Sequence, residues 1–251
     1  MTQVRISVVI PILNEAEELP ALLVSLQALG RETEIHFVDG GSRDGSQALV
    51  RAAGHAVHTS APDRARQMNA GAQAAGGDVL LFLHADARLS AEGLEAVRQA
   101  MRDPAVVAGR FDLVYETSAW PYPWVAWTGN LRSRLTRIFT GDQTIFVRRA
   151  AFDAVGGYPD IPLMEDVEIS RRLKRLGRMA CLKARVVGST RKCRREGVWS
   201  TLALMWLLRT LHALGVSPAR LHQLYYRRDA TKRLPQSPPV PRPKSHRSGS
   251  A

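Results

Sequence analysis

The sequence predicts an α/β fold built on a mostly parallel, doubly wound sheet, and three observations lead to this prediction. Strand and helix patterns alternate from residue 1 to about residue 115, as in successive β-α-β units. The run 80–83 is apolar at every position, which is typical of a strand buried on both faces of a parallel sheet. Polar residues follow these strands directly, where open α/β sheets bind their ligands. The 251 residues, 45% of them hydrophobic, suffice for one such domain with a sizeable core.

The first half of the chain is expected to alternate regularly. The predicted strands lie at 5–10, 34–38, 55–59 and 79–84. Helices are expected after the turn 11–15 as far as residue 29, from residue 46, over 64–75, and from residue 90 to about 102. Gly30 suits the position just beyond the end of a helix, and Ser90 suits a helix N-cap.

The pattern changes in the second half. A long strand is expected at 106–115, an aromatic and proline-broken segment at 120–124, a helix at 125–137 and a strand at 143–148. A turn at 156–159, a helix at 166–176, an apolar helix at 199–214 and a further helix from 217 complete the ordered chain. We therefore predict a domain over 1–228, with a nucleotide-binding half (1–115), an acceptor half (116–198) and C-terminal helices (199–228). The basic, Pro-rich tail 229–251 is predicted to be disordered.

Charge and cysteine content narrow the class of protein. The formal net charge is +12, which suits anionic partners such as phosphates, nucleic acid or an acidic membrane surface. The two cysteines, Cys181 and Cys193, have no metal-ligand spacing, so a reducing cytosol is the simplest compartment. No secretory signal is recognisable at the N-terminus. We expect a cytoplasmic protein, with peripheral attachment to the inner face of the membrane as an option.

Polar residues follow three of the predicted strands. Pro11 to Glu15 follow the first strand, Asp39 ends the second before a glycine-rich turn, and His84-Ala85-Asp86 end the fourth. Because the carboxyl ends of parallel strands meet at one edge of a sheet, these segments are expected to converge. Asp86 then stands where a metal-bound diphosphate would be held, since carboxylate and phosphate oxygens suit a hard divalent cation.

Taken together, the segments 9–15 (VIPILNE), 38–45 (VDGGSRDG) and 84–86 (HAD) resemble the family 2 glycosyltransferases of GT-A fold. The segments 141–143 (GDQ), 156–158 (GGY) and 164–166 (MED) fit the same scheme, and the resemblance covers roughly residues 5–215. The chain looks closest to a bacterial subgroup with His-Ala-Asp in place of Asp-x-Asp, often labelled arsenosugar-biosynthesis glycosyltransferases. The resemblance implies inverting transfer of a sugar from a nucleotide-diphosphate donor, a UDP-sugar, to a hydroxyl acceptor, assisted by Mn²⁺ or Mg²⁺.

The same resemblance implies a set of nucleotide-binding residues. They are Pro11, Asn14, Glu15, Asp39, Arg66 and His84. Asp39 would accept a hydrogen bond from the base, with a turn-capping carboxylate as the alternative. Asn14 and Glu15 would contact base or ribose, although Glu15 equally suits the dipole of the next helix. Arg66 is preferred to Arg64 for the base carbonyl or a phosphate, against the alternative of a solvated basic face.

The metal and its neighbour come from the His-Ala-Asp segment. The resemblance implies that Asp86 holds the divalent cation. His84 replaces the family's first carboxylate, so it would hydrogen-bond a ribose hydroxyl or ligate a transition metal. The alternative is a buried strand residue whose ring is already hydrogen-bonded.

The remaining candidates lie on the acceptor side. Asp166 is expected to act as the catalytic base with Glu165 orienting it, and the alternative is that Asp166 only caps a helix. Asp142 and Gln143 would shape the acceptor pocket, or only form a turn. Arg191 and Lys192 would neutralise the leaving diphosphate, or only form a solvated basic loop.

The helix predicted at 199–214 has two interpretations. It is too short and too charged for a transmembrane span, which needs about 20 apolar residues. It would either pack in the core, which we prefer, or lie in the interface of an anionic membrane. As alternatives to a transferase, we keep an inactive nucleotide-binding module and an enzyme that acts on a lipid-linked acceptor at a membrane surface. Specific nucleic-acid binding is disfavoured, because no helix-turn-helix, zinc or RNA-binding signature is present.

Overall fold

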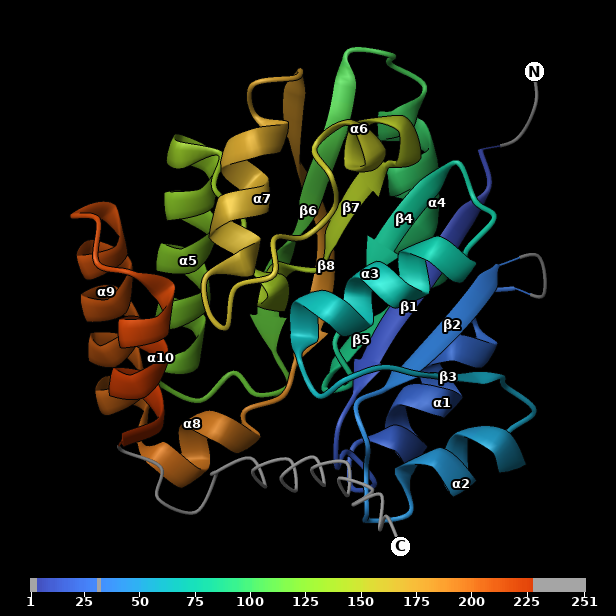
Figure 1. The fold of residues 1–251 in the computed structure, drawn as a ribbon, viewed down its shortest axis with the longest axis horizontal. Coiled ribbons are helices and arrows are strands. Elements are labelled where there is room, and N and C mark those ends of the chain that lie inside the picture. The colour runs from blue at the N-terminus through green and yellow to red at the C-terminus, as the bar shows by residue number, and fades with distance from the viewer. Residues whose placement is uncertain (1–3, 31–32, 228–251) are drawn as a thin grey trace, which may run out of the picture.

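The computed structural model describes residues 4–30 and 33–227, and it confirms the predicted α/β fold (Figure 1). One eight-stranded sheet runs through the domain in the order β3-β2-β1-β4-β7-β6-β8-β5. The predicted tail at 229–251 lies outside the described residues. No helix in the described part of the chain is both long enough and apolar enough to cross a membrane.

The first half forms the parallel part of the sheet. Its elements are β1 (Ile6–Ile12), α1 (Leu19–Gln27), β2 (Glu34–Asp39), α2 (Ser46–Ala52), β3 (Val57–Thr59), α3 (Arg64–Ala74) and β4 (Val79–Phe82). Strand β1 pairs in parallel with both β2 and β4. The strand order therefore reverses at β1, and the crevice outside its carboxyl end is where such sheets bind ligands.

The second half is less regular than the sequence predicts. Its elements are β5 (Ala87–Leu89), α4 (Ala91–Met101), β6 (Val106–Tyr115), α5 (Tyr122–Thr136), the 3₁₀ turn η1 (Gly141–Gln143), β7 (Ile145–Arg148), α6 (Arg149–Ala154), α7 (Glu165–Leu173), β8 (Arg178–Gly188), α8 (Arg191–Glu196), α9 (Val198–Ala213) and α10 (Pro218–Arg227). Strands β5 and β8 and helices α6 and α8 are absent from the prediction. The sequence pattern does not predict β8, because Arg and Lys interrupt its apolar residues. In the structure, β8 pairs with both β6 and β5.

Two hydrophobic layers enclose the sheet. On one face, α1, α2 and α4 pack against alternate residues of β1 and β4, including Ile10 and Leu81. On the other face, α3, α6 and α7 cover residues such as Val9 and Leu80. The alternation along β1 and β4 explains why these runs are apolar at every position, since each face has its own cover.

The prediction that the helix at 199–214 packs in the core is wrong, because most of α9 is not buried. Its one buried residue among those described is Leu208, which packs with Met164 and Val167 of the α7 region and Leu221 of α10. Figure 1 shows α9 and α10 together at one edge of the molecule, outside the two layers that cover the sheet. The remaining apolar residues of α9 are therefore free of the main core.

Candidate active site

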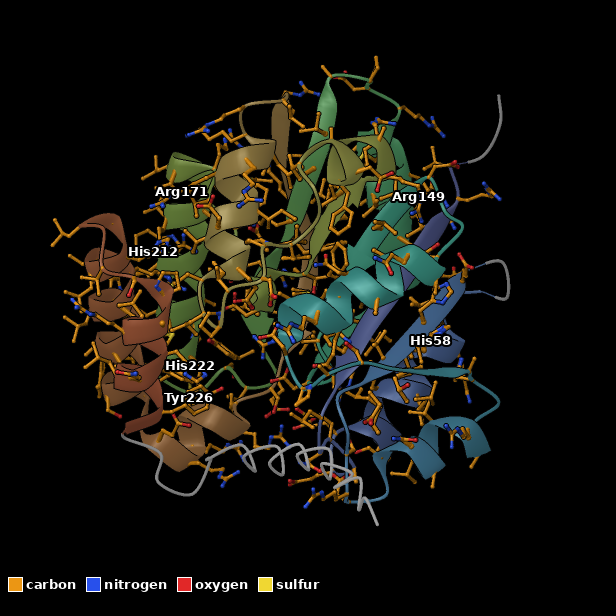
Figure 2. The ribbon with its side chains drawn as sticks, in the orientation of Figure 1. His58, Arg149, Arg171, His212, His222 and Tyr226 are labelled. Carbon is orange, nitrogen blue, oxygen red and sulfur yellow. The ribbon has the colours of Figure 1, made fainter. Side chains whose placement is uncertain are left out.

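A cavity of about 640 Å³ lies where the two halves of the chain meet. Cavities of roughly 300–1,000 Å³ are typical of small-molecule and cofactor sites. Nine of the predicted site residues line it: Pro11, Glu15, His84, Asp86, Asp142, Gln143, Glu165, Asp166 and Arg191. Asn14, Asp39 and Arg66 are not in the lining, and the side chain of Lys192 is outside the described part. Helix α10 contributes His222 and Tyr226, labelled in Figure 2, to the wall.

Asp39 ends β2 and is fully buried. Its Oδ2 accepts hydrogen bonds from the backbone N–H of Gly41 (2.7 Å) and Ser42 (3.0 Å) and from Nε2 of Gln47 (2.7 Å). Its Oδ1 is buried without a hydrogen-bond partner among the described residues. The turn-capping alternative thus accounts for one oxygen, whereas the second oxygen is buried without a partner among the described residues and lies outside the cavity lining.

Asn14 joins the first two strand-end turns. Its backbone N–H donates to Oγ of Ser42, and its Oδ1 accepts from the backbone N–H of Arg43, both at 2.9 Å. Its φ of 55° lies in the left-handed region, which asparagine tolerates better than most residues. The structure therefore gives Asn14 a scaffolding contact rather than a place in the cavity wall.

His84 and Asp166 meet on either side of Gly141. The backbone N–H of Gly141 donates to Oδ2 of Asp166 at 2.9 Å. A Cβ at residue 141 would lie 2.5 Å from Cε1 of His84, so only glycine fits there. Burial, with the positive charge of Arg64 as a second cause, lowers the pKa of His84 to about 3. The imidazole is therefore neutral at physiological pH and offers one nitrogen lone pair.

Glu165 and Asp166 begin α7 after a strained residue. Met164 has a φ of 70°, a costly conformation for a side chain of this size that is often found at functional sites. Burial, and then the charge of Asp166, raise the pKa of Glu165 to about 7. A carboxyl group that titrates near neutrality in a cavity wall is a candidate for acid-base chemistry.

Arg64 is the residue that the sequence prediction missed in favour of Arg66. Arg64 lines the open cavity with an exposed side chain; desolvation there lowers the pKa of Arg64, but the carboxylates of Glu165 and Asp86 raise it overall. Arg66 points elsewhere and makes an exposed two-bond pair with Asp160, at 2.9 and 2.8 Å. Helical spacing could have identified Arg64, because it lies on the same face of α3 as Gln67. The Nε2 of Gln67 donates to the carbonyls at the ends of β1 and β2.

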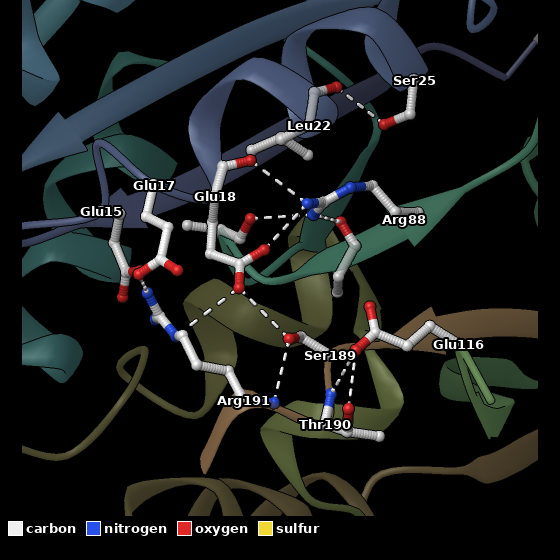
Figure 3. Close-up of polar contacts among 12 residues, drawn as sticks. Glu15, Glu17, Glu18, Leu22, Ser25, Arg88, Glu116, Ser189, Thr190 and Arg191 are labelled. Carbon is white, nitrogen blue, oxygen red and sulfur yellow. Dashed lines mark hydrogen bonds and ion pairs between the residues drawn. The ribbon is translucent and has the colours of Figure 1, made fainter. Parts of the chain in front are cut away.

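Arg191, the predicted diphosphate ligand, is held among glutamates (Figure 3). It contacts Glu15 at 2.7 Å, Glu18 at 3.5 Å and Glu17 at 3.7 Å. Glu18 also binds Arg88 at 3.0 Å and accepts from Oγ of Ser189 at 3.2 Å. This acidic cluster connects the turn after β1 to the start of α8, so Arg191 lies at the cavity wall with its charge already compensated.

The acceptor-side pair divides into an exposed and a buried residue. Asp142 is exposed, whereas Gln143 is 1% exposed and its Nε2 donates to Oδ1 of Asn130 and Oγ of Ser133 of α5. The cavity wall here also contains Arg132 and Arg209, which the prediction did not single out. Burial, and then the positive charge of Arg209, lower the pKa of Arg132 to about 10. Two neighbouring guanidinium groups therefore make this end of the cavity electropositive.

The metal-ligating side chains near Asp86 suit a cation that is bound partly by the protein and partly by a ligand. Within residues 4–30 and 33–227, no group of three or more His, Cys, Asp or Glu side chains is arranged to hold a metal ion by itself. Asp86 and Glu15 present hard oxygens to the cavity, and the neutral His84 stands nearby. A divalent cation would complete its ligand shell with diphosphate oxygens and water, as Mg²⁺ commonly does.

Comparison with known sequences gives partial matches. The chain is 35% identical over 127 residues to the undecaprenyl-phosphate 4-deoxy-4-formamido-L-arabinose transferase of Pseudomonas aeruginosa, which covers 46% of this chain and 38% of that relative. The match therefore spans less than half of the relative's length.

Solved structures show the same fold. The mannosyltransferase PcManGT from Pyrobaculum calidifontis, in complex with GDP-Man and Mn²⁺, aligns with a TM-score of 0.66 at 22% identity over 92% of this chain and 71% of that one. The glucosyl-3-phosphoglycerate synthase of Mycobacterium tuberculosis, in complex with Mn²⁺, UDP and glucosyl-3-phosphoglycerate, aligns with a TM-score of 0.56 at 18% identity over 72% and 70%. TarS 1-349 of S. aureus with UDP-GlcNAc gives 0.61 at 20% identity over 74% and 58%.

The family model described as "Glycosyl transferase family 2" matches residues 7–156, which include most of β1, the Asp39 turn, the His-Ala-Asp segment and η1. This match covers more than half of the chain, and the fold agrees with it. The chain therefore belongs to glycosyltransferase family 2.

Proposed function

We propose that the protein transfers a sugar from a nucleotide-diphosphate donor, a UDP-sugar, to a hydroxyl acceptor with inversion at the anomeric carbon. The observation that carries this proposal is the joint placement of Asp86, Arg64 and Asp166 in the wall of one cavity. The related structures contain GDP-Man or UDP compounds, two of them with Mn²⁺. The His-Ala-Asp segment supports the proposal that the chain falls in the bacterial subgroup with His-Ala-Asp in place of Asp-x-Asp.

The donor binds against the carboxyl ends of β1, β2 and β4. Oδ1 of Asp39 accepts a hydrogen bond from the base. The support for this assignment is that Oδ1 is buried and has no hydrogen-bond partner among the described residues. Arg64 takes the role first given to Arg66, because its guanidinium faces the carboxylates of the cavity. His84 offers its lone pair to a ribose hydroxyl, and Pro11 and Glu15 line the same wall.

Asp86 holds the diphosphate end of the donor. A divalent cation, Mn²⁺ or Mg²⁺, would bind Asp86 together with the donor's diphosphate oxygens and would neutralise the negative charge that develops there. Arg64 stands beside the same carboxylate and adds a fixed positive charge. Arg191 can bind the diphosphate only if its guanidinium first breaks its hydrogen bond to Glu15.

Asp166 acts as the base. Its Oδ2 is held by the N–H of Gly141, so the carboxylate is oriented before the acceptor arrives. As the acceptor oxygen forms its bond to the anomeric carbon, its proton passes to Asp166. The bond from that carbon to the diphosphate breaks, and the diphosphate leaves with the electron pair. Glu165 orients Asp166 and the acceptor, and Asp142 and Gln143 shape the acceptor end of the cavity.

The test separates donor binding from turnover. Thermal unfolding is followed with UDP, GDP and their sugar conjugates, with and without Mn²⁺, since a ligand that binds only the folded state raises its stability. Sugar release or transfer is measured in parallel for the parent and Asp166→Asn. We expect the variant to keep the donor-induced stabilisation and to lose about 10²–10⁴-fold in rate.

Three outcomes would count against this proposal. Parent-like turnover in Asp166→Asn would remove the base assignment. Donor binding without any turnover in the parent, over a broad panel of acceptors, would favour the inactive nucleotide-binding module. Absence of stabilisation by every nucleotide diphosphate would contradict the donor class itself.

A further inference from the structure

All five tryptophans of the chain lie on two helices at one edge of the molecule or on the turn that leads into one of them. Trp120, Trp124 and Trp127 belong to α5 and the turn before it, and Trp199 and Trp206 belong to α9. Their exposed fractions run from 38% for Trp124 to 71% for Trp120. The ring centroids of Trp124 and Trp199 are 5.8 Å apart, so this pair connects the two helices. Figure 1 shows α5 and α9 on the same side of the domain.

Helix α5 carries a continuous apolar stripe on its outer side. Positions 120, 124, 127, 131 and 135 recur every three or four residues, so their side chains share one face of the helix. Leu131 and Leu135 are exposed like the tryptophans. The opposite face of α5 is the buried one, with Tyr122, Ala126 and Ser133. We call the exposed set the tryptophan face; its members are Trp120, Trp124, Trp127, Leu131, Leu135, Trp199, Trp206 and Leu207.

An exposed apolar side chain is ordinary, but a contiguous group of this kind is not. Such a patch on a folded domain marks a surface that meets a partner. The five tryptophans are the most informative members, because indole rings favour the boundary between a membrane and water.

The charges around the tryptophan face identify the partner. The sequences of α5, α8, α9 and α10 contain one acidic residue, Glu196, and are rich in arginine. Arg194, Arg195 and Arg220 are exposed on the helices beside it. A second copy of the chain would bring like charges together at this surface, whereas anionic lipid headgroups would be attracted to them.

We propose that the tryptophan face docks on an anionic lipid bilayer, with α5 and α9 lying in the membrane interface. The attachment that we propose is peripheral, through exposed side chains of α5 and α9. Helix α9 also contributes Met205, Trp206 and Arg209 to the cavity wall, and docking therefore sets that end of the cavity against the lipid surface. The proposal stands on the surface alone and does not depend on the transferase activity.

The distribution of tryptophans supplies the probe. Because every indole lies on this face, the intrinsic fluorescence of the whole protein reports on it. With phosphatidylcholine vesicles that contain phosphatidylglycerol, we expect a blue shift of the emission and quenching by brominated lipid chains. Added salt is expected to weaken binding, since it screens the arginines. Unchanged emission with these vesicles, or equal binding to pure phosphatidylcholine, would overturn the proposal.

A matched pair of variants locates the surface. Trp127→Gln with Leu135→Gln removes two exposed side chains that are not in the cavity wall. Val24→Gln with Leu176→Gln removes two exposed apolar side chains elsewhere. The first pair is expected to weaken vesicle binding at least about tenfold, and the control pair to leave it unchanged.

Two results would contradict this assignment. Equal vesicle binding by both pairs would show that the tryptophan face is not the surface involved. Self-association without vesicles, abolished by the first pair alone, would show that a second copy covers the face. Circular dichroism of each variant confirms that these exposed substitutions leave the fold intact.

Discussion

The two walls of the cavity are held in place by different means. The donor wall is formed by the turns after β1, β2 and β4, and hydrogen bonds between side chains and backbone hold these turns together. For example, the carboxylate of Asp44 accepts from the backbone N–H of Ala16 at 2.9 Å and of Ser46 at 3.0 Å. The acceptor wall is formed by η1, the start of α7 and helices α5, α9 and α10. There, the side chain of Arg209 makes no hydrogen bond or ion pair to another described residue. The donor wall is thus cross-linked by hydrogen bonds between its turns. On the acceptor wall, η1 is also hydrogen-bonded to α5 and α7, but α9 and α10 pack on α7 through the cluster around Leu208.

The largest expected effect tests the donor wall through two neighbouring arginines. Arg64→Met should lower kcat/KM by about 10²–10³-fold, because it removes a fixed charge from the cavity. Arg66→Met is the matched control, and it should stay near the parent because its exposed pair with Asp160 contributes little. The measurement is steady-state transfer with the donor found in the binding panel. Equal losses in both variants would show that the cavity does not distinguish them.

The second prediction tests how independently the acceptor wall is held. Leu208→Ala removes the buried contact of α9 with α7 and α10, and such a truncation costs about 2–5 kcal/mol. Leu207→Ala, at a 53% exposed neighbour, should cost far less. Hydrogen exchange should show loss of protection in α9 and α10 of the first variant, with β1 and β4 unchanged. Faster exchange throughout the sheet would show that the two walls unfold together.

The third prediction returns to the donor wall and isolates one oxygen. In Asp39→Asn, the amide oxygen can still accept from Gly41, Ser42 and Gln47, while the amide nitrogen replaces the unpartnered Oδ1. The turn should persist, but a base N–H would meet a donor instead of an acceptor. Nucleotide affinity should fall about 10–100-fold, as expected for one lost hydrogen bond to a buried group. Calorimetric titration with UDP measures it, and parent-like affinity would remove Asp39 from base recognition.

The way in which the donor wall is built explains why the sequence located its strand-end segments. The donor wall consists of short segments that directly follow apolar strands, so strand ends, turn residues and order along the chain all locate it. Pro11, Glu15, His84 and Asp86 line the cavity as a result. The boundary error was small, since β4 ends at Phe82 instead of residue 84.

Elements outside the strand-end turns were predicted less well for physical reasons, although all four acceptor-side candidates, Asp142, Gln143, Glu165 and Asp166, line the cavity. Basic residues at 178, 183 and 185 interrupt the apolar residues of β8, so its pairing with β6 over a long register is decided by tertiary contacts. The choice between Arg64 and Arg66 depended on which face of α3 meets the sheet, which is a packing property. Helix α9 was assigned to the core because it is apolar, but its exposed tryptophans show that apolar composition alone does not determine burial.

The smallest expected effect concerns Glu165 and its dependence on pH. Burial, and then the charge of Asp166, raise its pKa from 4.5 to about 7 in the folded protein. The stability that protonated Glu165 contributes is therefore fully present below about pH 4.5 and is lost as the pH rises to about 7. Glu165→Gln stays neutral, so above pH 7 it should be more stable than the parent by on the order of 1 kcal/mol.

Urea unfolding of the parent and Glu165→Gln at several pH values measures this difference. The two stability curves should diverge as the pH rises across that interval, and curves that remain parallel would contradict the raised pKa. Turnover of the same variant decides between the two carboxyl groups at the start of α7. If Asp166 is the base and Glu165 only orients it, Glu165→Gln loses less activity than Asp166→Asn. A loss as large as that of Asp166→Asn would transfer the base to Glu165, the carboxyl group that the acceptor wall buries more deeply.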